Sequence, residues 1–289
     1  MTARAVLVGC AKLPEGDGDE RAVLPALAEI GVTAGWAVWD DDAADFATAD
    51  LVILRATWDY TARRADFLDW CASVPTLRNS VDVVHWNTDK TYLLDLESAG
   101  VPIVPTRLVP PGTEPDWPDV PFVLKPTVGA GSRGAARFAG GSGDAAAHLR
   151  SLHQRGHAVL LQPYQSSVDA EGETALVFFG GVYSHAFTKA AMLTGAGVDG
   201  SGLFVSEKLG PVEPEPGFRA LAEDVLDAAV ERLGGRRADL LYARVDVVRG
   251  DDGRPVLLEL ELAEPSLGFA HADAAAPLRF ASAVRQQLR

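Results

Sequence analysis

Short apolar runs alternate with helically spaced apolar residues along the first hundred positions of the chain. Val6–Val8, Trp36–Trp39 and Leu51–Leu54 are bounded by glycine or aspartate, a pattern typical of buried strands. Between the first two runs, Glu20–Ile30 carries its apolar residues on one helical face and stops at Gly31. Strands that alternate with helices predict an α/β unit built on a parallel sheet.

From residue 101 onward the pattern changes to hairpins, glycine-rich loops and separate helices. A helix is expected over Thr88–Ala99, capped by Thr88, and the prolines of Val101–Pro105 exclude helix after it. Strands are expected at Phe122–Lys125, Ala135–Phe138 and Val159–Gln162, hairpins at residues 173–190 and 240–262, and helices at Asp144–Gln154, Gly217–Leu233 and Ala274–Leu288. We therefore predict an α/β N-terminal domain over residues 1–85, followed by an α+β fold in two lobes, 86–165 and 166–289.

Composition narrows the kind of partner that the protein can have. The 289 residues include 26 Lys and Arg against 40 Asp and Glu, a net charge of −14. This charge repels polyanions and anionic membranes, which argues against both as partners but not against a small anion in a locally basic pocket. No apolar run approaches the roughly 18 residues of a membrane helix. Cys10 and Cys71 are too few for a disulfide framework and are expected as thiols of a cytoplasmic protein.

The strongest signal for chemistry is a group of carboxylates on the second predicted hairpin. Side chains alternate along a strand, so Arg244 and Asp246 share one face, as do Glu259 and Glu261. If Asp246 lies opposite Glu259, then Arg244 lies opposite Glu261. Carboxylates that face each other at about 5 Å repel, and a set of oxygen ligands suits a bridging Mg²⁺. A solvent-facing hairpin with a glutamate–arginine pair explains the same pattern without a metal.

A lysine followed by a glycine-rich loop is the second signal. Lys125 ends a predicted strand, and Thr127–Gly134 contains three glycines before the next strand. Glycines let backbone N–H groups approach phosphate oxygens, and a lysine adds positive charge. The loop lacks the Gly-Lys-Ser/Thr ending of a P-loop, so we expect the tip of a hairpin folded over a nucleotide; a surface turn is the alternative. Lys90 lies unfavourably against the dipole of the helix expected after Thr88, which hints at a functional cation.

A strand exit and the acids after it are candidates for nucleoside binding. Gln162, Pro163 and Tyr164 end a strand whose backbone groups can pair with an adenine edge. Asp169 or Glu173, a little further on, can hold ribose hydroxyls. An ordinary strand-to-loop exit accounts for the same residues.

In this order, these features resemble the ATP-grasp superfamily over roughly residues 86–270. The resemblance implies ATP and Mg²⁺ as cofactors, and a ligase that activates a carboxylate as an acyl phosphate before a nucleophile displaces phosphate. It assigns the phosphates to Lys90 and Lys125 and the cover of the triphosphate to Thr127–Gly134, with Gly129, Gly131 and Ser132. It assigns adenine to Gln162, Pro163 and Tyr164, ribose to Asp169 or Glu173, Mg²⁺ to Asp246, Glu259 and Glu261, and the transferring phosphoryl group to Arg244. Many members end the metal motif as Glu-x-Asn, so the Glu-x-Glu of this chain leaves the number of metal ions open.

Four further strings are similar to one branch of that superfamily, the cyclo-ligases of the cycloserine pathway. They are Leu54–Tyr60, His85–Lys90, Tyr183–His185 and Glu264–Leu267. The resemblance implies a small amino-acid-like substrate, O-ureido-D-serine, whose carboxylate is phosphorylated. Its own ureido nitrogen then attacks, which closes the isoxazolidinone ring of D-cycloserine with loss of the carbamoyl group.

Substrate contacts are expected at polar residues near strand ends. Arg55, Thr57 and Asp59 follow a strand of the first unit, where ligands bind in open α/β sheets; a structural role explains them equally. Lys189 and His185 share one face of a hairpin strand. Lys189 is expected to face phosphate as a catalytic residue, and His185 either contacts substrate or packs in the core. The remaining substrate candidates are Arg133 in the glycine-rich loop and Ser266 after the metal hairpin.

Other functions stay open on the sequence alone. The glycine-laden loop Met192–Gly202 is a candidate lid or a plain surface loop. An intermolecular ligase acting on a peptide or protein fits the same motifs, although its docking face would be expected to be basic. A non-catalytic nucleotide-binding module would be expected to lose lysines or carboxylates that are present here. No Gly-x-Gly-x-x-Gly follows the first strand, which argues against a dehydrogenase, and a homodimer is left open.

Overall fold

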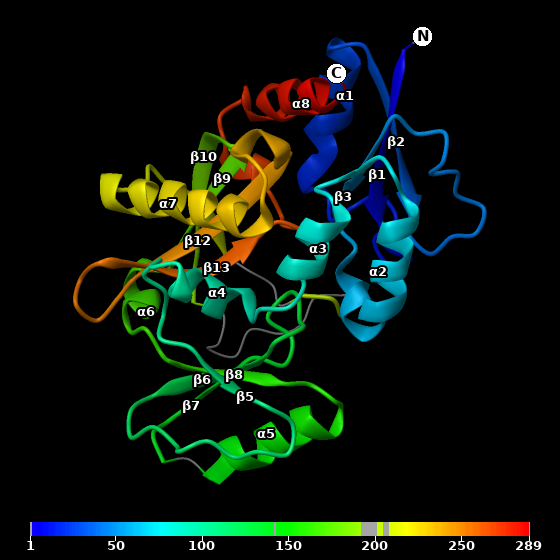
Figure 1. Cartoon of the computed structure of the whole chain (residues 1–289). Helices are drawn as coiled ribbons and strands as arrows, with labels where there is room; N and C mark the ends of the chain where they lie inside the picture. The colour runs from blue at the N-terminus through cyan, green and yellow to red at the C-terminus, as the bar shows by residue number, and fades with distance from the viewer. Residues whose placement is uncertain (1, 142, 192–200, 205–207, 289) are drawn as a thin grey trace.

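The computed structural model describes the chain except for residues 1, 142, 192–200, 205–207 and 289 (Figure 1). The described residues form an N-terminal α/β unit, a small lobe and a large lobe, each built on one sheet. The candidate lid falls mostly in the segment 192–200, outside the described residues.

The N-terminal unit has a parallel sheet in the order β2-β1-β3-β4. Its strands are β1 (Ala3–Gly9), β2 (Val32–Val38), β3 (Leu51–Leu54) and β4 (Leu77–Arg78), and its helices are α1 (Val23–Glu29), α2 (Arg64–Ser73) and α3 (Val81–Asn87). The expected helix Glu20–Ile30 is divided between a 3-10 turn at Asp19–Ala22 and α1. Both cysteines are buried free thiols, Cys71 on α2 beside Trp39 and Phe67.

The small lobe is a four-stranded antiparallel sheet covered on one face by a helix. Its strands, in the order β5-β8-β6-β7, are β5 (Arg107–Val109), β8 (Val159–Pro163), β6 (Phe122–Pro126) and β7 (Ala136–Phe138), and the helix is α5 (Gly143–Gln154). Leu149 and Leu152 of α5 pack on Phe122 and Leu124 of β6. The expected hairpin is confirmed: β6 and β7 pair with each other, and the glycine-rich loop connects them at the tip.

The large lobe is a five-stranded sheet in the order β11-β10-β9-β12-β13. Its elements are β9 (Glu173–Phe179), β10 (Val182–Lys189), β11 (Leu209–Pro211), β12 (Tyr242–Arg249) and β13 (Pro255–Glu261), with α4 (Tyr92–Ser98), α6 (Ser167–Glu171), α7 (Pro216–Leu233) and α8 (Ala276–Gln287). Helices α4 and α7 pack on one face of this sheet (Figure 1). The other face is covered by α8 and by the N-terminal unit, so apolar residues of β1, α1, β9 and α8 share one core.

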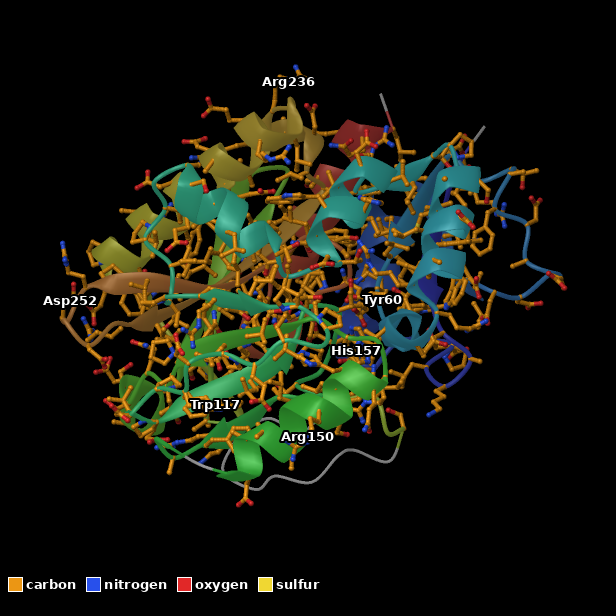
Figure 2. The ribbon with its side chains drawn as sticks, turned by 60° about the horizontal axis from the view of Figure 1, so that its bottom comes forward. Tyr60, Trp117, Arg150, His157, Arg236 and Asp252 are labelled. Carbon is orange, nitrogen blue, oxygen red and sulfur yellow. The ribbon has the colours of Figure 1, made fainter. Side chains whose placement is uncertain are left out.

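The two lobes and the N-terminal unit surround the site from three sides. Figure 2 shows Trp117 and Arg150 on the small lobe and Asp252 at the tip of the β12–β13 hairpin.

Strand β13 is an edge strand, and its outer side is closed by Asn87, which donates to the Leu260 carbonyl (2.8 Å) and accepts from the Leu262 amide (2.6 Å). An asparagine at the end of α3 therefore holds the strand that carries two of the three predicted metal ligands.

The helix expected over Thr88–Ala99 was wrong at its start. Helix α3 ends at Asn87, the Thr88 amide closes its last turn on Val84, and α4 begins at Tyr92. Thr88 is thus the C-cap of α3 and not the N-cap of the next helix, and its hydroxyl accepts a hydrogen bond from Arg64 (2.9 Å). Lys90 directly precedes Thr91, the N-cap of α4, so it still lies near the positive end of a helix, and Glu259 compensates its charge (2.7 Å).

Candidate active site

A cavity of about 280 Å³ lies between the small and large lobes, with the N-terminal unit closing one side. The predicted site residues that line it are Lys90, Lys125, Gly129, Gly131, Ser132, Arg133, Gln162, Pro163, Tyr164, Glu173, Lys189, Arg244, Glu259, Glu261 and Ser266. Segments far apart in sequence thus converge on one space. The clustering of these candidates is what the order of motifs predicts.

The predicted carboxylates on β12 and β13 form one cluster. Asp246 pairs with Glu259 and Arg244 with Glu261, in the expected register, and a β-bulge follows Asp246. One oxygen of each of Asp246, Glu259 and Glu261 lies within 4.8 Å of the others. Three carboxylates at this spacing fit a hard cation such as Mg²⁺, which takes oxygen ligands.

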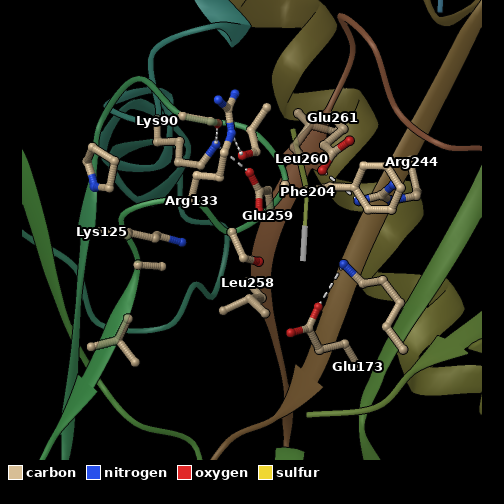
Figure 3. A pocket seen from close by; sticks show the side chains of 18 of the residues that line it. Lys90, Lys125, Arg133, Glu173, Phe204, Arg244, Leu258, Glu259, Leu260 and Glu261 are labelled. Atoms are coloured by element: carbon tan, nitrogen blue, oxygen red, sulfur yellow. Dashed lines mark hydrogen bonds and ion pairs between the residues drawn. The ribbon is translucent and has the colours of Figure 1, made fainter. Parts of the chain in front are cut away.

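Each carboxylate of this cluster already contacts a cation. Lys90 lies 2.7 Å from Glu259, Lys189 lies 2.6 Å from Asp246, and Arg244 lies 2.6 Å from Glu261 and 2.9 Å from Asp246. Figure 3 shows Lys90 beside Glu259 and Arg244 beside Glu261. The lysines and the arginine, which can neutralise phosphates, therefore pair with the carboxylates, which can hold a metal. They pair because a buried charge is costly unless an opposite charge compensates it.

These ion pairs set the pKa values of the cluster. Burial alone would raise the pKa of Asp246, but Arg244 and Lys189 outweigh it and lower that pKa to about 2. Glu259 behaves alike, with burial outweighed by Lys90 and Lys125 and a pKa of about 2. Burial raises the pKa of Glu261 to about 7, with only partial relief from Arg244. Asp246 and Glu259 are therefore ionised at neutral pH, as metal ligands must be.

Lys125 differs from the other two lysines. Within the described part of the chain, no carboxylate oxygen lies within 4.0 Å of its Nζ, whereas Lys90 and Lys189 both have such partners. Burial lowers the pKa of Lys125. Its side chain extends from β6 toward the cavity (Figure 3). A buried amine without a counter-ion is well suited to bind an anionic ligand.

The glycine-rich loop reaches the opposite wall of the cavity. Gly131 has φ +60°, and a Cβ there would lie 2.5 Å from the Leu203 carbonyl oxygen, so only glycine fits. Lys90 donates to the Gly129 carbonyl (2.8 Å) and so ties the loop to the metal cluster. Arg133 donates to the Trp58 carbonyl and the Thr61 hydroxyl, both at 2.8 Å. The loop thereby connects the small lobe to the N-terminal unit.

The predicted nucleoside end of the cavity has an apolar floor. Val104, Val123, Leu209 and Leu258 line it together with Gln162, Pro163 and Tyr164. Of the two ribose candidates, only Glu173 lines the cavity, where it pairs with Lys189 (2.8 Å). The prediction for Asp169 is corrected: its carboxylate accepts from the Tyr164 hydroxyl (2.5 Å) and Arg137 (3.2 Å), outside the cavity lining.

Four of the predicted substrate residues lie outside the cavity lining and are corrected to structural roles. Arg55 is 1% exposed and pairs with Glu20 (2.9 Å) while donating to the Pro265 carbonyl. Thr57 is fully buried. Asp59 accepts from the Trp39 indole (2.9 Å), and His185 contacts the Leu267 carbonyl (2.7 Å) between Phe179 and Phe269. Arg55, Asp59 and His185 are held by protein partners that no local pattern indicates, whereas the Thr57 hydroxyl is buried without a hydrogen-bond partner among the described residues.

The structure also adds residues that the sequence analysis passed over. Trp58, Tyr60 and Glu264 line the cavity, and burial raises the pKa of Glu264 to about 8. All three belong to the strings Leu54–Tyr60 and Glu264–Leu267, which were used only for the resemblance. The signal that could have found Glu264 is its spacing, because it follows Glu261 by three residues at the exit of the same strand.

Comparison with known proteins identifies the family. A model of the N-terminal domain of D-cycloserine synthetase DcsG matches residues 5–82. The cycloserine biosynthesis protein DcsG of Streptomyces lavendulae is 37% identical over the full length of both chains. The chain belongs to the DcsG family.

Solved structures agree with this family assignment. The crystal structure of a D-cycloserine synthetase DcsG superposes with a TM-score of 0.88 at 35% identity, over 99% of this chain and all of that one. A D-alanine–D-alanine ligase from Bacillus anthracis superposes with a TM-score of 0.69 at 14% identity, over 99% and 97% of the two chains, which shows the shared fold alone. The predicted fold class, an α/β N-terminal domain followed by an α+β ATP-grasp fold, is confirmed. This DcsG-family chain is an ATP-dependent carbon–nitrogen ligase with a small-molecule substrate, and none of its described helices is long and apolar enough to cross a membrane.

Proposed function

We propose that the protein closes O-ureido-D-serine to D-cycloserine, with ADP and phosphate as products. The observation that carries this proposal is the full-length identity of 37% to a cycloserine biosynthesis protein. The intact set of cavity lysines and carboxylates supports it, since a non-catalytic relative would not need to keep them. The finer assignments, namely Mg²⁺, the cytoplasm, a free amino-acid-like substrate without nucleic-acid or membrane partners, and a homodimer, are proposals of the same kind.

Each part of the cavity then has a task. Asp246, Glu259 and Glu261 would hold Mg²⁺, which when bound neutralises charge on the phosphates. Lys90, Lys125 and Lys189 bind phosphate oxygens, and Arg244 stabilises the charge that develops on the transferring phosphoryl group. Residues 127–134 exclude water over the triphosphate, Gln162 to Tyr164 hold adenine, and Glu173 holds ribose. Arg133 and Ser266 face the substrate end.

The reaction needs orientation and charge more than covalent catalysis. A substrate carboxylate oxygen takes the γ-phosphoryl group of ATP and releases ADP. The nitrogen bonded to oxygen in the ureido group then attacks the activated carbonyl carbon, loses its proton and expels phosphate, which closes the five-membered ring. A water molecule then attacks the carbamoyl carbon, the bond to the ring nitrogen breaks, that nitrogen takes a proton, and the carbamate released decomposes to carbon dioxide and ammonia. Because nucleophile and electrophile belong to one molecule, the cavity has to fold the substrate and keep water out until the ring has closed.

A substrate assay tests this proposal directly. Purified protein with ATP, Mg²⁺ and O-ureido-D-serine is expected to release ADP and a cyclised product that mass spectrometry detects. Lys125→Met serves as the inactive control, because it removes the cavity amine that pairs with no carboxylate among the described residues. Release of ADP only with a pair of amino acids would refute the cyclisation and favour an intermolecular ligase.

A further inference from the structure

Glu264 places a carboxyl group in the cavity wall, three residues beyond Glu261. The residue is only 9% exposed. The Tyr60 hydroxyl is its hydrogen-bond partner, and Lys90, which lies in the same cavity, is already paired with Glu259. A buried carboxylate with one hydroxyl partner is costly to ionise unless a cation joins it.

The other buried acids nearby all have such a cation. Glu173 pairs with Lys189, and Glu20 with Arg55, while each member of the metal cluster pairs with Lys90, Lys189 or Arg244. Within the described part of the chain, no lysine or arginine nitrogen lies within 4.0 Å of a Glu264 oxygen. The undescribed internal residues, 142, 192–200 and 205–207, contain no lysine, arginine or histidine. Neither the described residues nor the undescribed internal ones therefore supply Glu264 with the cation that a buried carboxylate is expected to have.

The backbone around Glu264 is fixed from several directions. The Trp58 indole donates to the Glu264 carbonyl (2.9 Å), Arg55 donates to that of Pro265, and Arg244 to that of Ser266 (3.0 Å). Asp19 accepts from the next amide, that of Leu267 (3.0 Å). Three successive carbonyls and the following amide are thus anchored, so the carboxyl group is held in place before a ligand arrives.

Building on the proposed function, we propose that Glu264, assisted by Tyr60, binds the ammonium group of the amino-acid-like substrate. In such a substrate the amino group is one carbon away from the carboxylate to be activated. Glu264 lines the same cavity as Glu259 and Glu261, three residues beyond the latter, and so lies near the carboxylates that would hold Mg²⁺ for that activation. Asp17, another acid of the cavity lining, is exposed to solvent, which weakens its attraction for a cation.

The test compares O-ureido-D-serine with its analogue lacking the amino group, 3-(ureidooxy)propanoate, in an assay of ADP release. We expect the wild type to prefer the amine by at least about 100-fold in kcat/KM, because a receptor left without its ligand group is costly. In Glu264→Gln, kcat/KM for O-ureido-D-serine is expected to fall by about 100-fold, mainly through a higher KM, whereas kcat/KM for 3-(ureidooxy)propanoate changes little. Its affinity for MgADP, measured by calorimetry, is expected to match the wild type. Glu264→Asp restores part of the preference.

Three outcomes separate the alternatives. An unchanged amine preference in Glu264→Gln overturns the proposal, as does loss of that preference in Asp17→Asn. If the wild type releases no ADP with either compound, the proposed cyclisation fails instead. In that case Glu264→Gln and Asp17→Asn are assayed with D- and L-amino acids and with the matching acids that lack the amino group. If Glu264→Gln still prefers the compounds with an amino group, the proposed role of Glu264 is overturned.

Discussion

Two polar strings in this molecule follow buried strands, but they have opposite roles. Arg55, Thr57 and Asp59 follow β3, and their side chains are buried or engaged by protein groups outside the cavity. Glu259, Glu261 and Glu264, along and beyond β13, line the cavity instead. Both strings have the composition of a binding site. The difference lies in where the protein partners are: Glu259 and Glu261 pair with Lys90 and Arg244, which line the cavity as well. Arg55 pairs instead with Glu20, which lies outside the cavity lining.

The two strings also touch each other. Arg55 donates to the Pro265 carbonyl, and Trp58 to that of Glu264. The string after β3, which we call the brace (residues 55–59), therefore supports the string after β13, which we call the catalytic string (residues 259–266). If this division is correct, substitutions in the catalytic string stop chemistry without unfolding, and substitutions in the brace act mainly on stability.

The largest effect is expected in the catalytic string. Glu259→Ala removes a candidate metal ligand and leaves Lys90 without its partner, and we expect turnover to fall by on the order of 10³-fold, the scale seen when phosphoryl transfer loses a charge-stabilising group. The melting temperature is expected to change by only a few degrees, because this pair faces the cavity. ADP release and thermal unfolding check both statements.

Glu97→Ala, an exposed glutamate on α4, is the matched control and is expected to keep full activity. A Glu259→Ala protein that turns over at the wild-type rate would refute the metal site. A variant that fails to fold would show that the catalytic string is structural as well.

The next largest effect is expected in the brace. Arg55→Ala leaves the buried Glu20 carboxyl group without its cation, which costs about 3–5 kcal/mol of unfolding free energy. Urea unfolding measures this loss. The double variant Arg55→Met/Glu20→Gln removes both charges and is expected to recover most of it. A single variant as stable as the wild type would show that the buried pair is not what holds the brace.

The division between brace and catalytic string marks how far the sequence predicts the site. Strand alternation placed Arg244 with Asp246, and Glu259 with Glu261, but it left the pairing of Asp246 with Glu259 as a condition. The β-bulge between Asp246 and Val247, which no local pattern indicated, brings those two residues opposite each other. The lysine and glycine-rich loop were local patterns. Arg55 was misassigned because its partners are Glu20 and Pro265, the latter 210 positions away, and which partner meets it depends on how the N-terminal unit packs on the large sheet.

A pH titration sharpens the description of the brace. Burial, only partly offset by Arg55, raises the pKa of Glu20 from 4.5 to about 7. A raised carboxyl pKa means that the folded state binds the proton more tightly, so this contribution to stability is present below pH 4.5 and lost as pH rises through 7. Glu20→Gln cannot titrate. Relative to the wild type, its unfolding free energy is expected to rise by about 3 kcal/mol between pH 5 and pH 8.

Urea unfolding of both proteins at the two pH values gives this difference, and titrations elsewhere in the chain cancel in the comparison. Parallel stability curves for the two proteins would contradict the raised pKa. They would indicate that Arg55 keeps Glu20 ionised throughout.

The smallest effect is expected at Asp169, which belongs to neither string. Its carboxylate is 43% exposed and is claimed by the Tyr164 hydroxyl and by Arg137, whose guanidinium lies 3.6 Å from the Tyr164 ring centre. Solvent screens exposed pairs of this kind and the carboxylate lies outside the cavity lining, so Asp169→Asn is expected to change the KM for ATP by less than about twofold. Steady-state kinetics measure this, with Glu173→Gln as the comparison that should raise the same KM more. A tenfold rise for Asp169→Asn would restore its ribose role and show that a residue outside the cavity lining can still serve the site.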